Sequence, residues 1–80
     1  MADRKELEQK IIELAAVAYR KKIEDLTPDS KFQDLSSSSL LMAGLVSLIE
    51  DDYDVVMSMP EAGACKTISE LTDLVASRMK

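Results

Sequence analysis

The chain has 80 residues with fifteen acidic and ten basic side chains, so its formal net charge is −5, and 46% of its residues are apolar. These figures fit one small domain over residues 1–80 with an ordinary hydrophobic core. The chain has no histidine and one cysteine, which excludes Ser-His-Asp and Cys-His catalysis and Cys/His zinc sites. The acidic balance argues against nucleic-acid binding. Because the sequence offers no disulfide pair, signal peptide or membrane span, we expect a cytoplasmic monomer.

Apolar residues recur at helical spacing along the chain, which predicts an all-α fold. The first helix is expected from Asp3 to Lys21, with Asp3 as its N-cap. The residues expected to form its buried face are Leu7, Ile11, Leu14, Ala15 and Ala18. The charged residues between them are expected to face solvent.

A long connection over residues 22–35 follows the first helix. Its Thr27-Pro28-Asp29 sequence indicates a turn, because proline fixes φ and aspartate can hydrogen-bond to its own backbone. The apolar residues expected to hold the connection against the core are Ile23, Leu26, Phe32 and Leu35. Connections of this length are uncommon in small domains and often serve a function.

Four consecutive serines, Ser36 to Ser39, lead into a second helix that is apolar around most of its circumference. Ser38 or Ser39 is expected to be its N-cap. One apolar face is expected in the core, and another is expected to be exposed or to meet a partner. The helix is expected to end near Glu50-Asp51-Asp52, where three carboxylates oppose the helix dipole. Local stability does not explain that placement, which hints at a function.

An extended linker from Tyr53 to Met59 precedes a short third helix, with Pro60 at its first position and Gly63 at its end. Thr67 is expected to cap the last helix in a capping box with Glu70. The buried stripe of that helix is expected to contain Ile68, Leu71, Leu74, Val75 and Met79. The expected architecture is an irregular four-helix bundle with three main helices, one short third helix and a long first loop.

The negative charge is concentrated in one part of the chain. Residues 32–65 contain no lysine or arginine and carry a charge of −6, while the rest of the chain carries +1. The acidic residues of this segment are Asp34, Glu50, Asp51, Asp52, Asp54 and Glu61. Such a run is either a solvated face or a docking surface that steers basic partners toward it.

The segment from Phe32 to Leu40, F-Q-D-L-S-S-S-S-L, resembles the attachment motif of acyl carrier proteins, F-x-D-L-G-x-D-S-L. The matching positions are Phe32, Asp34, Leu35, Ser39 and Leu40. The stretch from Ile49 to Asp54, I-E-D-D-Y-D, is similar to the family's L-E-E-E-F-D. The likeness covers nearly the whole chain, from the long first loop to the last helix that begins at a threonine.

The resemblance implies that a serine hydroxyl at the start of the second helix carries a covalent 4′-phosphopantetheine arm, which holds acyl groups as thioesters. That role falls on Ser39, with Ser38 as a second candidate. A phosphodiester there would lie at the positive end of the helix dipole. The protein is then a carrier in fatty-acid or related lipid or polyketide synthesis, and not an enzyme. The alternative is an unmodified module with the carrier fold, in which the serines only cap the helix and its apolar start binds a protein.

The chain departs from the family pattern at four positions. Ser36 and Ser38 stand where the family has glycine and aspartate, and Leu41 and Gly44 stand where typical carriers have acidic residues. Glycine permits a backbone conformation that is costly for other residues, so Ser36 is expected to reshape the loop. These differences indicate a specialised carrier with a dedicated set of partners.

The partners that the resemblance implies are a phosphopantetheinyl transferase and enzymes that load and process acyl groups through basic docking patches. The residues expected to meet them are Leu41, Met42, Glu50, Asp51, Asp52 and Asp54. No cofactor other than 4′-phosphopantetheine is implied.

Three smaller features have plain interpretations. Cys65 takes the place of an aliphatic core residue and is expected to be a buried, inert thiol. Methionines, including Met42, Met57 and Met59, are expected either to fill the core or to line an adaptable pocket for an acyl chain. The stretch from Asp51 to Asp54 lacks the spacing and the glycine of a calcium loop, so no metal site is expected.

Overall fold

The computed structural model of the protein describes residues 4–79, and of Ser39 only the backbone. Within this range it has five α-helices, one 3₁₀ turn and no β-strand: α1 (Arg4–Tyr19), η1 (Ile23–Asp25), α2 (Phe32–Leu35), α3 (Ser39–Tyr53), α4 (Met59–Gly63) and α5 (Ile68–Arg78). The all-α prediction is confirmed, with three long helices and the short α4. The single turn of α2 inside the first connection was not predicted. None of the described helices has the length and apolar character needed to cross a membrane.

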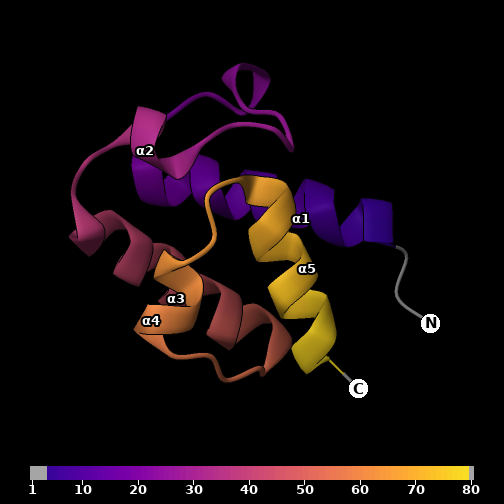
Figure 1. Cartoon of the computed structure of the whole chain (residues 1–80). Coiled ribbons are helices and arrows are strands. Elements are labelled where there is room, and N and C mark those ends of the chain that lie inside the picture. The colour runs from indigo at the N-terminus through magenta and orange to yellow at the C-terminus, as the bar shows by residue number, and fades with distance from the viewer. Residues whose placement is uncertain (1–3, 80) are drawn as a thin grey trace.

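The three long helices surround the core (Figure 1). α1 packs against both α3 and α5, and α4 packs against α3. The largest fully buried side chains come from all three long helices: Ile11, Leu45, Ile49, Ile68, Leu71, Thr72 and Val75. The hydroxyl of Thr72 donates a hydrogen bond to the carbonyl of Ile68 at 2.8 Å, which satisfies this polar group inside the core.

α1 buries a wider face than predicted. Leu14 and Ala18 of the predicted face are only half-buried. The buried residues of α1 are Leu7, Ile11, Ile12, Ala15, Ala16 and Tyr19. The face is wide because α3 and α5 both pack on this helix. The predicted N-cap, Asp3, lies outside the described residues, and α1 ends at Tyr19, earlier than predicted, because Arg20 has a left-handed φ of 56°.

Backbone hydrogen bonds fasten the first connection to the start of α5. The N–H of Ile68 donates to the carbonyl of Ser30 at 3.2 Å. Beside this bond, Lys31 and Thr67 form an isolated antiparallel bridge. The long loop is therefore held to the end of the molecule where α5 begins, as the path of the two segments in Figure 1 shows.

Side chains hold the same connection to the core, although not all of those predicted. Leu26 and Phe32 are buried, and Leu35 is half-buried and packs against the core. The ring of Phe32 contacts that of Tyr19, with a centroid separation of 5.8 Å. The prediction for Ile23 was wrong, because its side chain on η1 is 44% exposed.

α3 continues to Tyr53, slightly beyond its predicted end. Asp54 follows in a left-handed conformation, with φ 53° and ψ 41°, and its N–H donates to the carbonyl of Glu50 at 2.9 Å. Aspartate is one of the few residues other than glycine that visit this conformation. Val55 and Met57 are then buried, so the extended segment before α4 stays attached to the core.

Side chains cap the start of both C-terminal helices. Ser58 forms a complete capping box with Glu61 at the start of α4, which was not predicted. Thr67 accepts a hydrogen bond from the N–H of Glu70 at 3.1 Å, as predicted. The carboxylate of Glu70, however, accepts from the N–H of Lys66 at 3.0 Å. The predicted box at Thr67 is therefore only half made.

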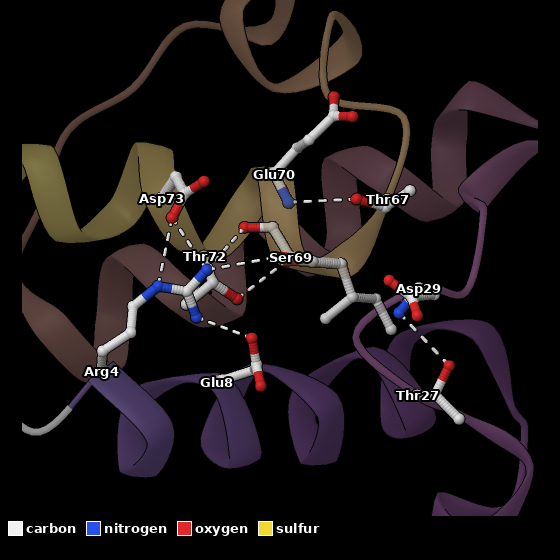
Figure 2. A network of polar contacts seen from close by, with 10 residues as sticks. Arg4, Glu8, Thr27, Asp29, Thr67, Ser69, Glu70, Thr72 and Asp73 are labelled. Carbon is white, nitrogen blue, oxygen red and sulfur yellow. Dashed lines mark hydrogen bonds and ion pairs between the residues drawn. The ribbon is translucent and has the colours of Figure 1, made fainter.

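A polar network joins the start of α1 to α5 (Figure 2). The guanidinium of Arg4 donates to Oδ1 of Asp73 from Nε at 3.1 Å and from Nη2 at 2.8 Å. Its Nη1 donates to Oε2 of Glu8 at 2.7 Å. Its Nη2 also donates to the carbonyl and to the hydroxyl of Ser69, at 3.2 and 3.1 Å. One planar side chain thus connects residues near the two ends of the chain.

We expect Arg4→Lys to lower the free energy of unfolding by about 1 kcal/mol, and Tm by about 4–8 °C for a domain of this size. Lysine keeps the charge but lacks the fork of donors that serves three residues at once. Thermal unfolding by circular dichroism measures the change. Arg20→Lys is the control, because Arg20 is exposed, and its Tm is expected to stay the same. An unchanged Tm in Arg4→Lys would contradict a role for the network in stability.

Candidate functional site

In the loop before α3, the side chain of Ser36 makes a hydrogen bond that holds the turn. The backbone of Ser36 is extended, with φ −169° and ψ 147°, a conformation open to any residue. Serine at this position therefore carries no backbone strain. Its Oγ accepts a hydrogen bond from the N–H of Ser38 at 3.0 Å, which a glycine at this position does not offer. Ser36 thus closes this turn through its own side chain.

Ser38 and Ser39 have different positions at the start of α3. Ser38 is the N-cap, with φ −85° and ψ 122°, and its Oγ accepts from the N–H of Leu40 at 3.3 Å. Ser39 is the first residue of the helix, and its side chain lies outside the described part of the structure. Of the two predicted caps, Ser38 has the role. The first turn of such a helix presents backbone N–H groups without partners in the helix, which favours a bound anion.

A pocket of about 1010 Å³ opens beside this helix start, at the upper end of the range for small-molecule sites. Its walls come from the loop before α3, the first turns of α3, α4 and the segment between α4 and α5. The apolar residues of its wall include Tyr19, Phe32, Leu40, Met42 and Met59. Ser36 to Ser38 line it as well. The serine run thus borders a space large enough for a flexible chain.

The apolar start of α3 divides between surface and interior. Leu40 is 79% exposed, Leu41 is half-buried, and Met42 is 6% exposed and lines the pocket. Met42 was expected to meet partners, but its burial keeps its side chain from a protein docked on the surface. Leu40 has the exposure that this role needs. The sequence did not single it out, because apolar residues surround most of this helix.

Acidic residues at the end of α3 and on α4 have partners within the chain. Asp52 pairs with Lys10 at 3.6 Å, and Glu61 forms an ion pair with Arg78. The carboxylate of Glu50 is half-buried and accepts from the N–H of Met57 at 3.3 Å. These contacts explain part of the placement of carboxylates at this helix end.

The acidic side chains left for other partners are fewer than the sequence suggested. Asp34, Asp51 and Asp54 are exposed, and no ion pair is found for them within residues 4–79. Asp51 and Asp54 lie together at the C-terminal end of α3, while Asp34 lies on α2. The negative field at the end of α3 therefore rests on Asp51 and Asp54, together with the hydrogen-bonded carboxylate of Glu50.

Cys65 is a half-buried thiol in the wall of the pocket. Its Sγ donates to the carbonyl of Glu61 at 3.6 Å. Burial raises the pKa of the thiol, and the nearby carboxylates of Glu70 and Asp73 raise it further. The thiol is therefore protonated at neutral pH and is a weak nucleophile.

Alkylation of Cys65 by iodoacetamide is expected to be several-fold slower in the folded chain than in urea at about pH 8. Only the thiolate reacts, and the raised pKa moves its formation above the usual value of about 8.5. The rate in the folded chain should rise with pH and keep rising past the point where the unfolded chain levels off. Equal rates in both states would contradict the raised pKa.

No metal centre is present in the part of the chain that the structure describes. Within residues 4–79, no group of three or more His, Cys, Asp or Glu side chains is arranged to hold a metal ion. The aspartates at the end of α3 are instead bound to Lys10 or exposed, and Asp54 ends the helix. The site consists of the serine run, the helix start and the pocket.

Known proteins match this chain over nearly its whole length. A family model described as "Phosphopantetheine attachment site" matches residues 9–75. Proteins named "Acyl carrier protein" from Rickettsia canadensis (strain McKiel) and Rickettsia rickettsii (strain Iowa) are 33% identical to it over 79 residues, which cover 98% of this chain and 92% of each relative. The same values hold for the protein of that name from Rickettsia typhi (strain Wilmington). Since the matched range includes the whole of α3 and its serine run, the chain belongs to the acyl carrier protein family.

Proposed function

We propose that this protein carries acyl intermediates as thioesters on a phosphopantetheine arm attached to Ser39, in fatty-acid or related lipid or polyketide synthesis. The observation that supports this most is the opening of an apolar pocket beside the first turn of α3, in a chain whose family is defined by phosphopantetheine attachment. Proteins of this family are carriers and not enzymes. The residues present fit the group, because a helix start favours its phosphate and apolar walls favour its cargo.

Ser39 is the better of the two candidate serines. The hydroxyl of Ser38 already accepts a hydrogen bond from the N–H of Leu40, so it has a structural task. Ser39 begins the helix proper, where a negative phosphodiester is stabilised by the positive end of the α3 dipole. In the attachment step, the hydroxyl oxygen of Ser39 bonds to the donor phosphorus that bears the pantetheine arm. The bond from that phosphorus to the bridging oxygen of the donor's diphosphate breaks, the nucleotide part of the donor leaves as a phosphate, and the modifying enzyme takes the hydroxyl proton.

Once bound, the arm supplies a terminal thiol that holds an acyl group as a thioester. The chain's own part is to shelter that group. Phe32 and Met42 are buried at the wall of the pocket, and Met59 lines it from α4. An acyl chain that enters this space removes its apolar surface from water, worth about 0.8 kcal/mol for each buried methylene.

Partner enzymes are proposed to dock along α3. The exposed apolar side chain of Leu40 lies at one end of the helix, and the exposed carboxylates of Asp51 and Asp54 lie at the other. Opposite charges speed the encounter, and an exposed apolar residue supplies contact area. Between them, Leu41 and Gly44 offer no charge, which supports a dedicated set of partners with a less basic docking patch.

Co-expression with a broad-specificity phosphopantetheinyl transferase is expected to raise the intact mass by one phosphopantetheine. Ser39→Ala should abolish this gain. Ser38→Ala is the matched control: it should keep the gain, although loss of the cap lowers the free energy of unfolding by about 1 kcal/mol. Circular dichroism shows that each variant is folded. Gain in Ser39→Ala together with loss in Ser38→Ala would move the site to Ser38. Lack of gain with any transferase would favour an unmodified interaction module.

Gly44→Glu is expected to improve recognition by general fatty-acid synthase enzymes with basic patches, by about threefold or more in kcat/KM. A side chain fits at this exposed position, because nothing lies within 4 Å of a Cβ placed there. Gly44→Ala is the control: it should stabilise α3 by about 1 kcal/mol without the gain in recognition. If both variants raised kcat/KM equally, the effect would belong to helix stability and not to charge.

A further inference from the structure

The pocket beside α3 is lined by positive charge, in a chain whose net charge is −5. Of the described residues that line it, the charged ones are Lys31 and Lys66, and no carboxylate is among them. These two lysines stand immediately before and after the segment of residues 32–65, which carries a charge of −6. The fold therefore places the two cations that flank the acidic segment on the wall of one pocket.

The backbone brings the two lysines together and fixes where they stand. Lys31 is bridged to Thr67, the neighbour of Lys66, and the N–H of Phe32 donates to the carbonyl of Lys66 at 3.0 Å. Phe32 is itself anchored in the core against Tyr19. The backbone hydrogen bonds between the first connection and the start of α5 thus fix both positions. Both lysines are exposed and line the pocket.

Neither lysine takes part in an ion pair within the described residues. The carboxylate of Glu70 is close by, but it accepts from the backbone N–H of Lys66 and is not part of the pocket wall. The two ammonium groups therefore remain available to an anion inside the pocket. A ligand that suits both the apolar wall and these cations has an apolar body and a negatively charged end.

We propose that the acyl group carried by this protein ends in a carboxylate, which Lys31 and Lys66 hold at the pocket while the apolar wall covers the chain between. This inference rests on the proposed carrier function and names the class of its cargo. The cationic pair attracts such an end, which favours the pocket as its place. An enzyme that works on this cargo then has to act on an acyl group with a thioester at one end and a free carboxylate at the other.

The test compares two cargoes with the same carbon chain, adipoyl with a terminal carboxylate and hexanoyl with a terminal methyl group. Each is loaded from its coenzyme A thioester by a broad-specificity transferase, and hydroxylamine cleavage of the thioester is followed by intact mass. For each cargo, protection is the cleavage rate of the free pantetheine thioester divided by the rate on the carrier. We expect this protection to be about threefold greater for adipoyl than for hexanoyl, which is the size of effect that two exposed ion pairs allow. Added salt should shrink the difference.

The variants separate the lysines from general charge. Lys31→Gln/Lys66→Gln should abolish the protection of adipoyl and leave hexanoyl unchanged. Lys21→Gln/Lys22→Gln removes the same charge outside the pocket wall and should leave both cargoes unchanged. If the pocket variant changed both cargoes equally, the lysines would bind the phosphate of the arm, which both cargoes share, and the inference would be overturned. Equal cleavage of the two cargoes on the unmutated carrier would overturn it as well.

Loading and protection are separate readouts, so the two proposals can fail separately. Absence of any mass gain would refute the carrier function. In that case, free adipoyl-pantetheine and hexanoyl-pantetheine are titrated into the unmodified chain and followed by the backbone amide signals of Lys31 and Lys66. Larger chemical-shift changes with adipoyl-pantetheine, lost in Lys31→Gln/Lys66→Gln, would support the pocket as a binding site for acyl chains that end in a carboxylate. No preference for adipoyl would remove that assignment too.

Discussion

The contact on which the site depends is the backbone pairing between the first connection and the chain that leads into the first turn of α5. The N–H of Phe32 donates to the carbonyl of Lys66, and the N–H of Ser69 donates to the carbonyl of Pro28 at 2.8 Å. This pairing holds Phe32 in the core, and Phe32 begins the single turn of α2 that leads into the serine run. A loop of this length without such bonds would not keep a serine at one place beside a pocket.

Periodicity and caps are local properties, and they explain why the helices could be predicted. Of the predicted stripe of α5, Ile68, Leu71 and Val75 are buried, while Leu74 and Met79 are only half-buried. The caps at Thr67 and Ser38 follow from residue types at fixed positions. The pairing at Lys66 could not be predicted, because every residue except proline offers the same N–H and carbonyl. Ile23 failed for a related reason: its apolar type indicates burial, but the turn of η1 leaves it exposed.

The charges of the site also depend on contacts between distant parts of the chain, which residue types alone do not reveal. The run of acidic residues was plain in the sequence, but Lys10 and Arg78, which neutralise two of them, come from other helices. Rules for neighbours on one helix do not reach such pairs. The sequence therefore overstated the acidic surface, and it showed Lys31 and Lys66 only as ordinary exposed lysines. Their common place on the pocket is a property of the fold.

In the function that we propose, separation of charge gives the molecule two faces with different tasks. Asp51 and Asp54 extend from the end of α3 into solvent, where they act over the distance at which an approaching protein is steered. Lys31 and Lys66 act at contact range, on whatever enters the pocket. A single net charge of −5 conceals this, because the cations lie where the anions do not. A basic partner and an anionic cargo can therefore be bound by one small domain at the same time, without competing for the same side chains.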